Sequence, residues 1–398
     1  MKMRSKFNYL FLLFIFLSMA AASQEQPKAE IYLITCGPGS EIYSMYGHSA
    51  LRVVVPGEKS DLVYNWGVFD FNTPNFTWKF AKGKLSYMLG VYSYDSFLKD
   101  YFAEERWVVS QKFNLDDTET ERLFQLLAEN LRPENVKYRY NFYYDDCSSR
   151  IRDIIEKAVG DNLLYPPDQN KELYTFRYLT GEYEKRYPWI KLGIDVLIGS
   201  PGDKKATFRD RMFLPADLKN GLSELLIRRD GRMIPLLSNP ETVLDFDQPV
   251  AKNKIVTSPL FLISFLLIIV IMLTGVLKGR AANNIMDIIL FTIFSFLALM
   301  LIFANFVTAH HELKWNFNII WLNPFIIICL ISLILNRNWY KWFRVVFYCE
   351  IIFLALMVFL PQHFNNAFFP MIIILLLRSS IRAGFKWNTL TPPYLTQL

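Results

Sequence analysis

The chain has 398 residues, a net charge of +6 and a composition that is 52% hydrophobic and 16% aromatic. Two soluble domains of this total length would be less apolar, so the composition indicates a membrane protein. The basic residues lie partly in the N-terminal segment and between apolar runs, and the remaining sequence mixes both signs of charge. We therefore expect no nucleic-acid partner.

Residues 1–22 have the pattern of a secretory signal peptide. Basic residues at 2, 4 and 6 precede an apolar run at 9–19, and alanines follow at 20–22. We expect cleavage after Ala22, because the run is short for a membrane span; a retained anchor is the alternative. Either way, the segment that follows is exported.

Residues 24–257 are the expected exported domain, with mixed composition and no long apolar run. The stretches HSALRVVV and DLVYNWGVFDF predict a β-hairpin across 48–71. DDTETERLFQLLAENLR predicts an amphipathic helix, and CSSRIRDIIEKAV predicts another that begins at Cys147, after two aspartates. The domain thus combines strands and helices.

Residues 258–390 are expected to form an all-α transmembrane bundle of about five helices. The apolar runs cover 258–277, 285–307, 318–335, 345–360 and 367–377; the last is short, contains Pro370 and ends before Arg378. Basic residues follow the first and third runs and fill the tail, whereas the alternate loops hold one lysine or none. This bias predicts a multi-pass protein of the bacterial inner membrane, with a periplasmic exported domain and a cytoplasmic C-terminus.

Cys147 and His48 are the candidate reactive residues of the exported domain. A helix N-terminus lowers the pKa of a thiol and offers N–H groups to an oxyanion, and His48 is the domain's only histidine. Three interpretations of Cys147 remain open: a buried structural thiol, a disulfide with Cys36, and a nucleophile with His48 as its base. Asp145 and Asp146 disfavour a thiolate and argue against the third.

A second polar group lies next to the apolar runs. His310, His311 and Glu312 follow the second run and His363 follows the fourth, all on the predicted outer side. They are candidates for binding a headgroup or an amine substrate; the alternative is that they cap helix ends. Adjacent histidines rarely bind one ion and no H-E-x-x-H motif is present, so we expect no metal.

Several stretches resemble a known family. CGPGSEIYSMYGHSALRVV, VYNWGVFDF and YYDDCSSRIRDIIEKAVGDNL are similar to the permuted papain-like (NlpC-like) thiol fold, in which histidine precedes cysteine. With TFRYLTGEYEKRYPWIKLGIDVLIGSPGD, MFLPADL and HHELKWNFNIIWLNP, the chain resembles the Bacteroidetes Lnb family of lipoprotein N-acyltransferases. One departure is Asp146 before Cys147, where the resemblance leads us to expect an asparagine.

This resemblance implies an α+β fold, in which an antiparallel sheet carries His48 and packs on the helix that begins at Cys147. It also implies a third polar residue that orients the imidazole. Asn65, in the returning arm of the hairpin, is the candidate, and Asp70 is the alternative.

The implied reaction moves an acyl chain from a phospholipid, through a thioester on Cys147, to the α-amine of the diacylglyceryl-cysteine that begins a lipoprotein. Ser148 and Tyr144 are candidates for stabilising the oxyanion. The reaction requires no cofactor. The alternatives are an NlpC-like cell-wall peptidase or amidase and a non-catalytic membrane scaffold.

Overall fold

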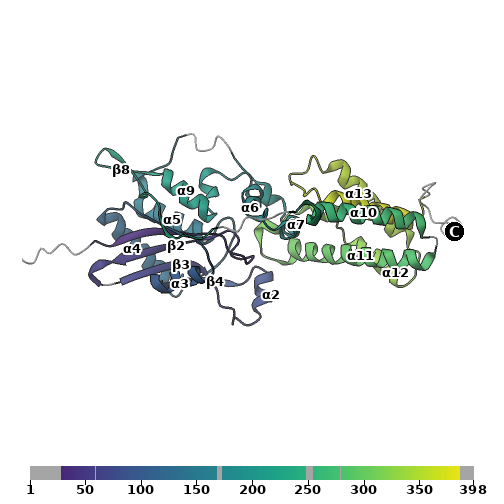
Figure 1. The fold of residues 1–398 in the computed structure, drawn as a ribbon, viewed down its shortest axis with the longest axis horizontal. Helices are drawn as coiled ribbons and strands as arrows, with labels where there is room; N and C mark the ends of the chain where they lie inside the picture. The colour runs from purple at the N-terminus through teal and green to yellow at the C-terminus, as the bar shows by residue number, and fades with distance from the viewer. Residues whose placement is uncertain (1–27, 59, 168–172, 248–253, 278, 386–398) are drawn as a thin grey trace, which may run out of the picture.

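The computed structural model describes residues 28–385 except 59, 168–172, 248–253 and 278. The expected signal peptide and the end of the C-terminal tail lie outside these residues. An α+β domain with an antiparallel sheet comes first, and a helical bundle follows it along the long axis of the molecule (Figure 1).

The main sheet has seven antiparallel strands among the described residues, in the order β10-β5-β1-β2-β3-β4-β6. Their bounds are β1 Glu30–Cys36, β2 His48–Val55, β3 Ser60–Val68, β4 Ser86–Ser93, β5 Val108–Lys112, β6 Lys137–Arg139 and β10 Glu241–Leu244. β2 and β3 are the predicted hairpin. A smaller sheet contains β7 Leu163–Leu164, β8 Leu226–Arg229 and β9 Arg232–Pro235.

Helices cover this domain on both sides of the sheet. They are α2 Phe76–Ala81, α3 Tyr94–Ala103, α4 Asp117–Leu131, α5 Cys147–Val159, α6 Phe176–Glu184, α7 Pro188–Leu197, α8 Phe208–Arg211 and α9 Pro215–Glu224. α5 packs on β2 and β3 and is flanked by α4 and α9, while α3 packs on β3 and β4. The predicted start of α5 at Cys147 is confirmed, and its apolar stripe of Ile151, Ile154 and Ile155 is buried.

The second domain contains α10 Pro259–Val276, α11 Arg280–Ile302, α12 Phe325–Ile334, α13 Tyr340–Leu356 and α14 Phe368–Arg382, and a π-helical turn, Phe303–Val307, extends α11. Within the described residues, two helices, Pro259–Val276 and Arg280–Val307, are long and apolar enough to cross a membrane. The predicted third span is a pair of segments, His311–Ile320 and Phe325–Ile334, bent by 57°. Pro324 lies between them and disfavours helical backbone at the residue before it.

The fifth apolar run ends at Leu377, but the helix that contains it, α14, continues to Arg382, so Arg378 lies within the helix. Pro370 is the third residue of α14, where a missing N–H costs little. Arg378 is fully buried and its Nε donates to Asp287 of α11 at 2.6 Å. This buried pair allows the charged residue to lie inside the bundle.

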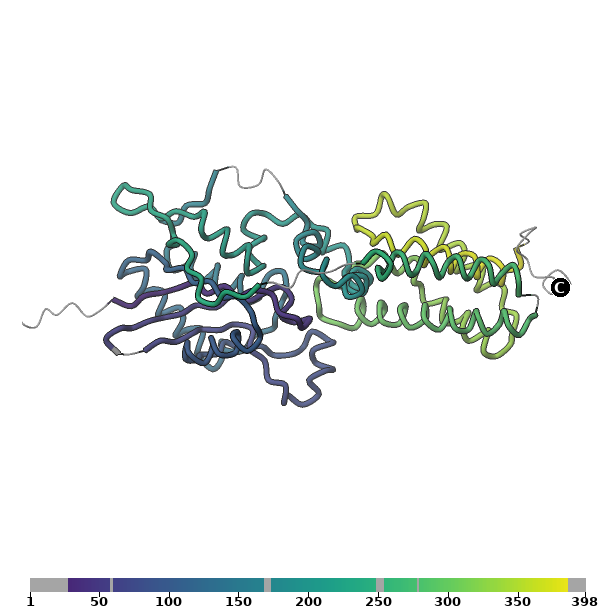
Figure 2. Tube along the Cα trace, in the orientation of Figure 1, coloured from purple at the N-terminus to yellow at the C-terminus, as the bar shows by residue number. Residues whose placement is uncertain are grey.

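Hydrogen bonds join the two domains. The Gly199 N–H donates to the Glu312 carbonyl at 2.9 Å, and Asn316 Nδ2 donates to the carbonyls of Val196 and Leu197 at 2.9 Å. The segment that makes these contacts, α6 to residue 203, lies between the sheet and the bundle in the tube view (Figure 2). The junction therefore fixes the α+β domain at one end of the helices.

Candidate active site

Cys147 is the first residue of α5 and only 5% exposed. Polar groups around its sulfur lower the pKa of the thiol: the backbone N–H groups of Ser49 and Ser148, and the side chains of Ser148 and Tyr140. Burial raises the pKa of the Cys147 thiol, and these donors offset only part of that rise. The thiol is therefore neutral at pH 7, with donors already in place to stabilise negative charge beside it.

Asp146, the residue that departs from the expected pattern, caps α5. Its Oδ1 accepts the Ser149 N–H at 2.8 Å, and Ser149 Oγ accepts the Asp146 N–H at 2.7 Å. Aspartate and asparagine stabilise a helix about equally well at the N-cap position. Burial raises the pKa of the Asp146 carboxyl, which reduces its negative charge next to Cys147. The departure thus keeps the cap that starts the helix.

His48 is the first residue of β2, and its Nε2 lies 2.6 Å from Oδ1 of Asn65 in β3. Because an amide oxygen only accepts, Nε2 carries the proton and Nδ1 has a free lone pair. Burial lowers the pKa of His48 to about 4, with Arg106 adding to the shift and Asn65 opposing it. The imidazole is therefore neutral at pH 7 and able to accept a proton at Nδ1.

The thiol lies against the start of β2, the strand that begins with His48. The sulfur lies against the N–H of Ser49, the residue after His48, and Ser148 Oγ donates to Ser49 Oγ at 3.1 Å. No hydrogen bond joins the Cys147 sulfur to His48 in the described part of the chain; the sulfur has Ser148 Oγ at 3.8 Å. The two neutral groups therefore belong to the packed starts of α5 and β2 and form no hydrogen bond with each other among the described residues.

Asp70 and Cys36 have other roles. Asp70 is exposed, and its Oδ1 accepts the Asn72 N–H at 2.8 Å in a turn, so Asn65 is the residue that contacts His48. Cys36 is a free thiol, 1% exposed, and packs with residues such as Ala50 on the side of α3. Burial raises its pKa to about 12. Cys36 therefore forms no disulfide with Cys147 in this structure.

Tyr144 and His311 approach each other across the domain junction. Their ring centroids are 6.0 Å apart, in an edge-to-face arrangement. Tyr144 also packs on Phe176, at 5.5 Å between ring centroids. Tyr144 is three residues before Cys147, so this contact brings the loop after α11 close to the start of α5.

His310 and Glu312 lie in the same loop but face α2. His310 Nε2 is 3.1 Å from the Phe80 carbonyl, and its Nδ1 is 3.4 Å from Glu312 Oε1. The hydrogen bond with Glu312 raises the pKa of His310. His363 is exposed in the connection between α13 and α14. Among residues with described positions, no group of three or more histidines, cysteines and acids is arranged to hold a metal.

Sequence reasoning missed two residues of the site, Tyr140 and Arg106. Tyr140 lies in YRYNFYYDD, where nothing distinguishes it from its aromatic neighbours. Arg106 is 5% exposed; its Nε donates to the Gly37 carbonyl and its Nη1 to Glu104, each at 2.8 Å. Both reach the site through contacts between distant parts of the chain, for which the sequence has no local signal.

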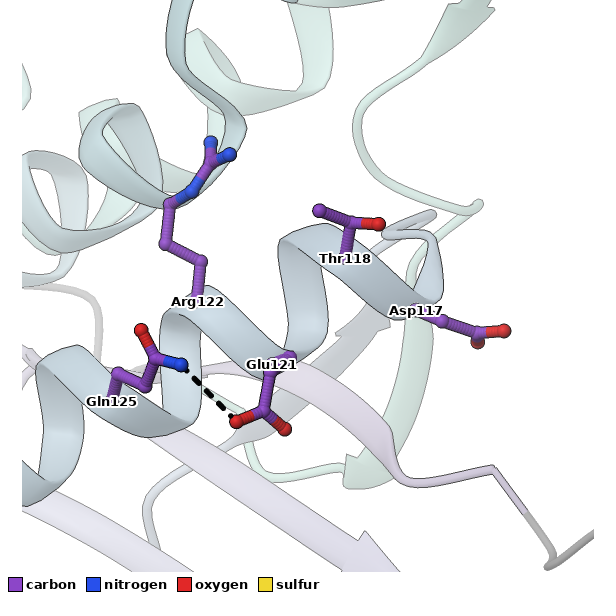
Figure 3. A pocket seen from close by; sticks show the side chains of 5 residues that line it. All are labelled: Asp117, Thr118, Glu121, Arg122 and Gln125. Atoms are coloured by element: carbon purple, nitrogen blue, oxygen red, sulfur yellow. Dashed lines mark hydrogen bonds between the residues drawn. The ribbon is translucent and has the colours of Figure 1, made fainter.

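One surface depression, about 390 Å³, lies along the outer face of α4 (Figure 3). It is lined by Asp117, Thr118, Glu121, Arg122 and Gln125. Arg122 Nη1 donates to the Ala158 carbonyl at 2.8 Å, near the C-terminal end of α5. The depression is therefore at the opposite end of α5 from Cys147 and is not part of the candidate site.

Fold and site together define a membrane protein whose α+β domain carries a buried thiol beside a histidine–asparagine pair. Residues 19–182 match the model of the Lnb N-terminal periplasmic domain, and residues 251–387 match that of the Lnb transmembrane domain. The chain belongs to the Lnb family, with a periplasmic N-terminal domain and a helical transmembrane domain. No curated protein and no solved structure matches it.

Proposed function

We propose that this protein is a lipoprotein N-acyltransferase. It moves an acyl chain from a phospholipid, through a thioester on Cys147, to the α-amine of the diacylglyceryl-cysteine at the start of a lipoprotein. The observation that carries this proposal is a buried thiol among hydrogen-bond donors, next to the His48–Asn65 pair. This arrangement supports a papain-like nucleophile, in a chain whose second domain is transmembrane.

In the first half-reaction, Sγ of Cys147 attacks the carbonyl carbon of a phospholipid ester while Nδ1 of His48 accepts the thiol proton. The donors around the sulfur, including the Tyr140 hydroxyl, stabilise the oxyanion. The C–O bond then breaks, and His48 returns the proton to the leaving alkoxide. The products are a lysophospholipid and an acyl-thioester.

In the second half-reaction, the α-amine of the lipoprotein attacks the thioester. His48 takes a proton from the amine, the C–S bond breaks, and the thiolate of Cys147 receives that proton. Because an amide is more stable than a thioester, the transfer proceeds without ATP and without a cofactor. The same imidazole serves as base and acid in both halves.

The alternative function, a cell-wall peptidase or amidase, would use the same thiol chemistry. Its substrate is not a lipid, so its reaction would not require the contact between the two domains. In this chain the loop after α11 reaches Tyr144, three residues before Cys147, which favours substrates held at the membrane surface. His310, His311 and Glu312 are accordingly proposed to bind the headgroup or the amine. His363, which is exposed, is proposed as a further member of this group. A scaffold stabilised by a Cys36–Cys147 disulfide is disfavoured by two free thiols.

The membrane orientation is part of the proposal. With the α+β domain in the periplasm, the bundle places the last described residues of α14 at the end away from that domain (Figure 1). The basic residues Arg337, Lys341 and Arg344 follow the third apolar run and agree with a cytoplasmic position for that end. The C-terminus is then cytoplasmic and the protein lies in the inner membrane.

The test is the intact mass of the N-terminal peptide of one lipoprotein, in cells that have no other N-acyltransferase. Cells that express this protein should add one amide-linked acyl chain, and cells with Cys147→Ala should add none. Cys349→Ala, in α13, is the matched control and should behave like the native protein. A gain that survives Cys147→Ala would overturn the thioester, and no gain with folded native protein would overturn the transferase.

A further inference from the structure

The segment at residues 71–84, here the α2 loop, extends from the sheet toward the bundle (Figure 1). The Trp78 ring lies 5.5 Å from that of Phe303, in the π-helical turn at the end of α11. The Ala309 N–H donates to the Lys82 carbonyl at 2.8 Å. The α2 loop is therefore held at the depth of the outer end of a transmembrane helix.

The surface of the α2 loop is unusually apolar for a segment outside the bundle. Phe71, Trp78 and Phe80 are 66%, 54% and 46% exposed, and α2 buries none of its residues. Residues 71–94 contain three lysines and no acidic residue. Exposed aromatic rings with lysines and without acids are typical of segments that lie among lipid headgroups, particularly anionic ones.

A row of aromatic rings connects this surface to the thiol. The centroid distances are 5.7 Å from Phe76 to Phe69, 5.5 Å from Phe69 to Tyr87 and 4.7 Å from Tyr87 to Tyr140. The Tyr140 side chain is near enough to the Cys147 sulfur to lower the pKa of the thiol. The row of rings therefore leads from the exposed α2 loop to the neighbourhood of the reacting atom.

We propose that the α2 loop is a lipid-binding surface that lies in the outer leaflet and delivers a phospholipid along this aromatic row to Cys147. The proposal rests on the proposed function, because it identifies where the acyl donor binds. The acyl chain lies against the rings, and the lysines bind the phosphate. Nζ of Lys82 lies 4.4 Å from the centre of the Trp78 ring, so a phosphate-binding charge and a ring for the acyl chain lie next to each other.

The first test compares two acyl donors on the full chain in phospholipid vesicles. Acyl-Cys147 is measured by intact mass, with vesicle phospholipid or with water-soluble p-nitrophenyl butyrate as the donor. In a Phe71→Ser, Trp78→Ser variant, the ratio of the vesicle rate to the soluble-ester rate should fall at least tenfold. Met233→Ser, on β9 and also 54% exposed, is the matched control and should keep the native ratio.

An unchanged ratio in the α2-loop variant would overturn this inference alone. If the native protein forms no acyl-Cys147 with either donor, the proposed function fails instead, so the two failures are distinguishable.

The second test measures depth without any acyl transfer. The emission of Trp78 is obtained as the difference in fluorescence between the native protein and the Trp78→Phe variant. Vesicles of brominated phospholipid should quench this emission, and acrylamide in the water should not. Quenching by acrylamide but not by brominated lipid would place the α2 loop in water and overturn the inference.

The lysines have their own measurement. Changing Lys79, Lys82 and Lys84 together to glutamine should abolish any preference for vesicles that contain phosphatidylglycerol over vesicles of phosphatidylcholine alone. Lys157→Gln, exposed on α5 and remote from the α2 loop, should leave that preference intact. A preference that persists in the triple variant would show that the lysines do not bind the phosphate.

Discussion

The Nε2 atom of His48 lies 2.6 Å from Oδ1 of Asn65, and the two residues belong to adjacent arms of one hairpin. This contact fixes the proton on Nε2 and leaves the lone pair of Nδ1 free to accept a proton. The backbone hydrogen bonds of the hairpin hold the two strands, and therefore the two side chains, at this distance. The tautomer is therefore set by the sheet before any substrate binds.

Asn65→Ala is expected to slow the formation of acyl-Cys147. The lost hydrogen bond stabilises an imidazolium in the transition state, and bonds to charged groups contribute about 1.5–3 kcal/mol, or about 10- to 150-fold in rate. The measurement is the rate of acyl-enzyme formation by intact mass. Asp70→Ala is the control and should stay within about twofold, since Asp70 contacts a turn; a larger effect at Asp70 would reverse the assignment.

The pH dependence of Cys147 alkylation should be that of a neutral thiol. Burial raises the pKa of Cys147, and the pKa of His48 is lowered to about 4, so between pH 5 and 8 neither group is charged. The rate with iodoacetamide, followed on the Cys147 peptide, should rise steadily with pH and remain below that of a free thiol. A rate that is constant from pH 5 to 8 would instead indicate a thiolate–imidazolium pair.

Tyr140→Phe should slow acylation more than Tyr144→Phe. The Tyr140 side chain is near the sulfur that attacks the carbonyl, so its hydroxyl is the better candidate to donate to the carbonyl oxygen, whereas Tyr144 packs on His311 and Phe176. Removing one oxyanion donor costs about 10²- to 10³-fold in other enzymes, and we expect about tenfold or more here because other donors remain. Single-turnover acylation of both variants decides the order, and a larger loss in Tyr144→Phe would support the assignment made from sequence.

Local sequence signals predicted the parts of the site that depend on neighbouring residues. Alternation and turn residues predicted the β2–β3 hairpin, and the aspartates before Cys147 predicted the start of α5, because hairpins and helix caps form between residues close in the chain. The partner of His48 was expected from the family resemblance, with Asn65 as the candidate and Asp70 as the alternative, and the hairpin brings Asn65 to the imidazole.

Contacts between distant segments were not predictable in this way. Arg378 follows the fifth apolar run, and the sequence does not show that Asp287, 91 residues earlier, pairs with it inside the bundle. Tyr140 reaches Cys147 because β6 pairs with β4, and the tyrosine-rich sequence does not reveal which ring turns inward. Hydropathy alone also gave no sign of the bend at Pro324.

The domain junction depends on the absence of a side chain at Gly199. A Cβ there would lie 1.8 Å from the Lys314 carbonyl oxygen, a backbone atom that cannot move without disturbing the loop. The φ angle of Gly199 is −86°, which alanine also adopts without strain. The effect of Gly199→Ala therefore comes from the clash with the Lys314 carbonyl. Gly193, in α7, has nothing within 4 Å of its Cβ position.

Gly199→Ala should therefore lower the thermal unfolding midpoint and separate the two domains, at a cost of at least about 1–3 kcal/mol. Acylation from vesicles should fall, while acylation by a water-soluble ester should fall less, because the thiol site itself is intact. Gly193→Ala should raise the midpoint slightly, since alanine is favoured over glycine in a helix by about 0.5–1 kcal/mol. A Gly199→Ala protein with native midpoint and native vesicle activity would show that close docking of the domains is not needed.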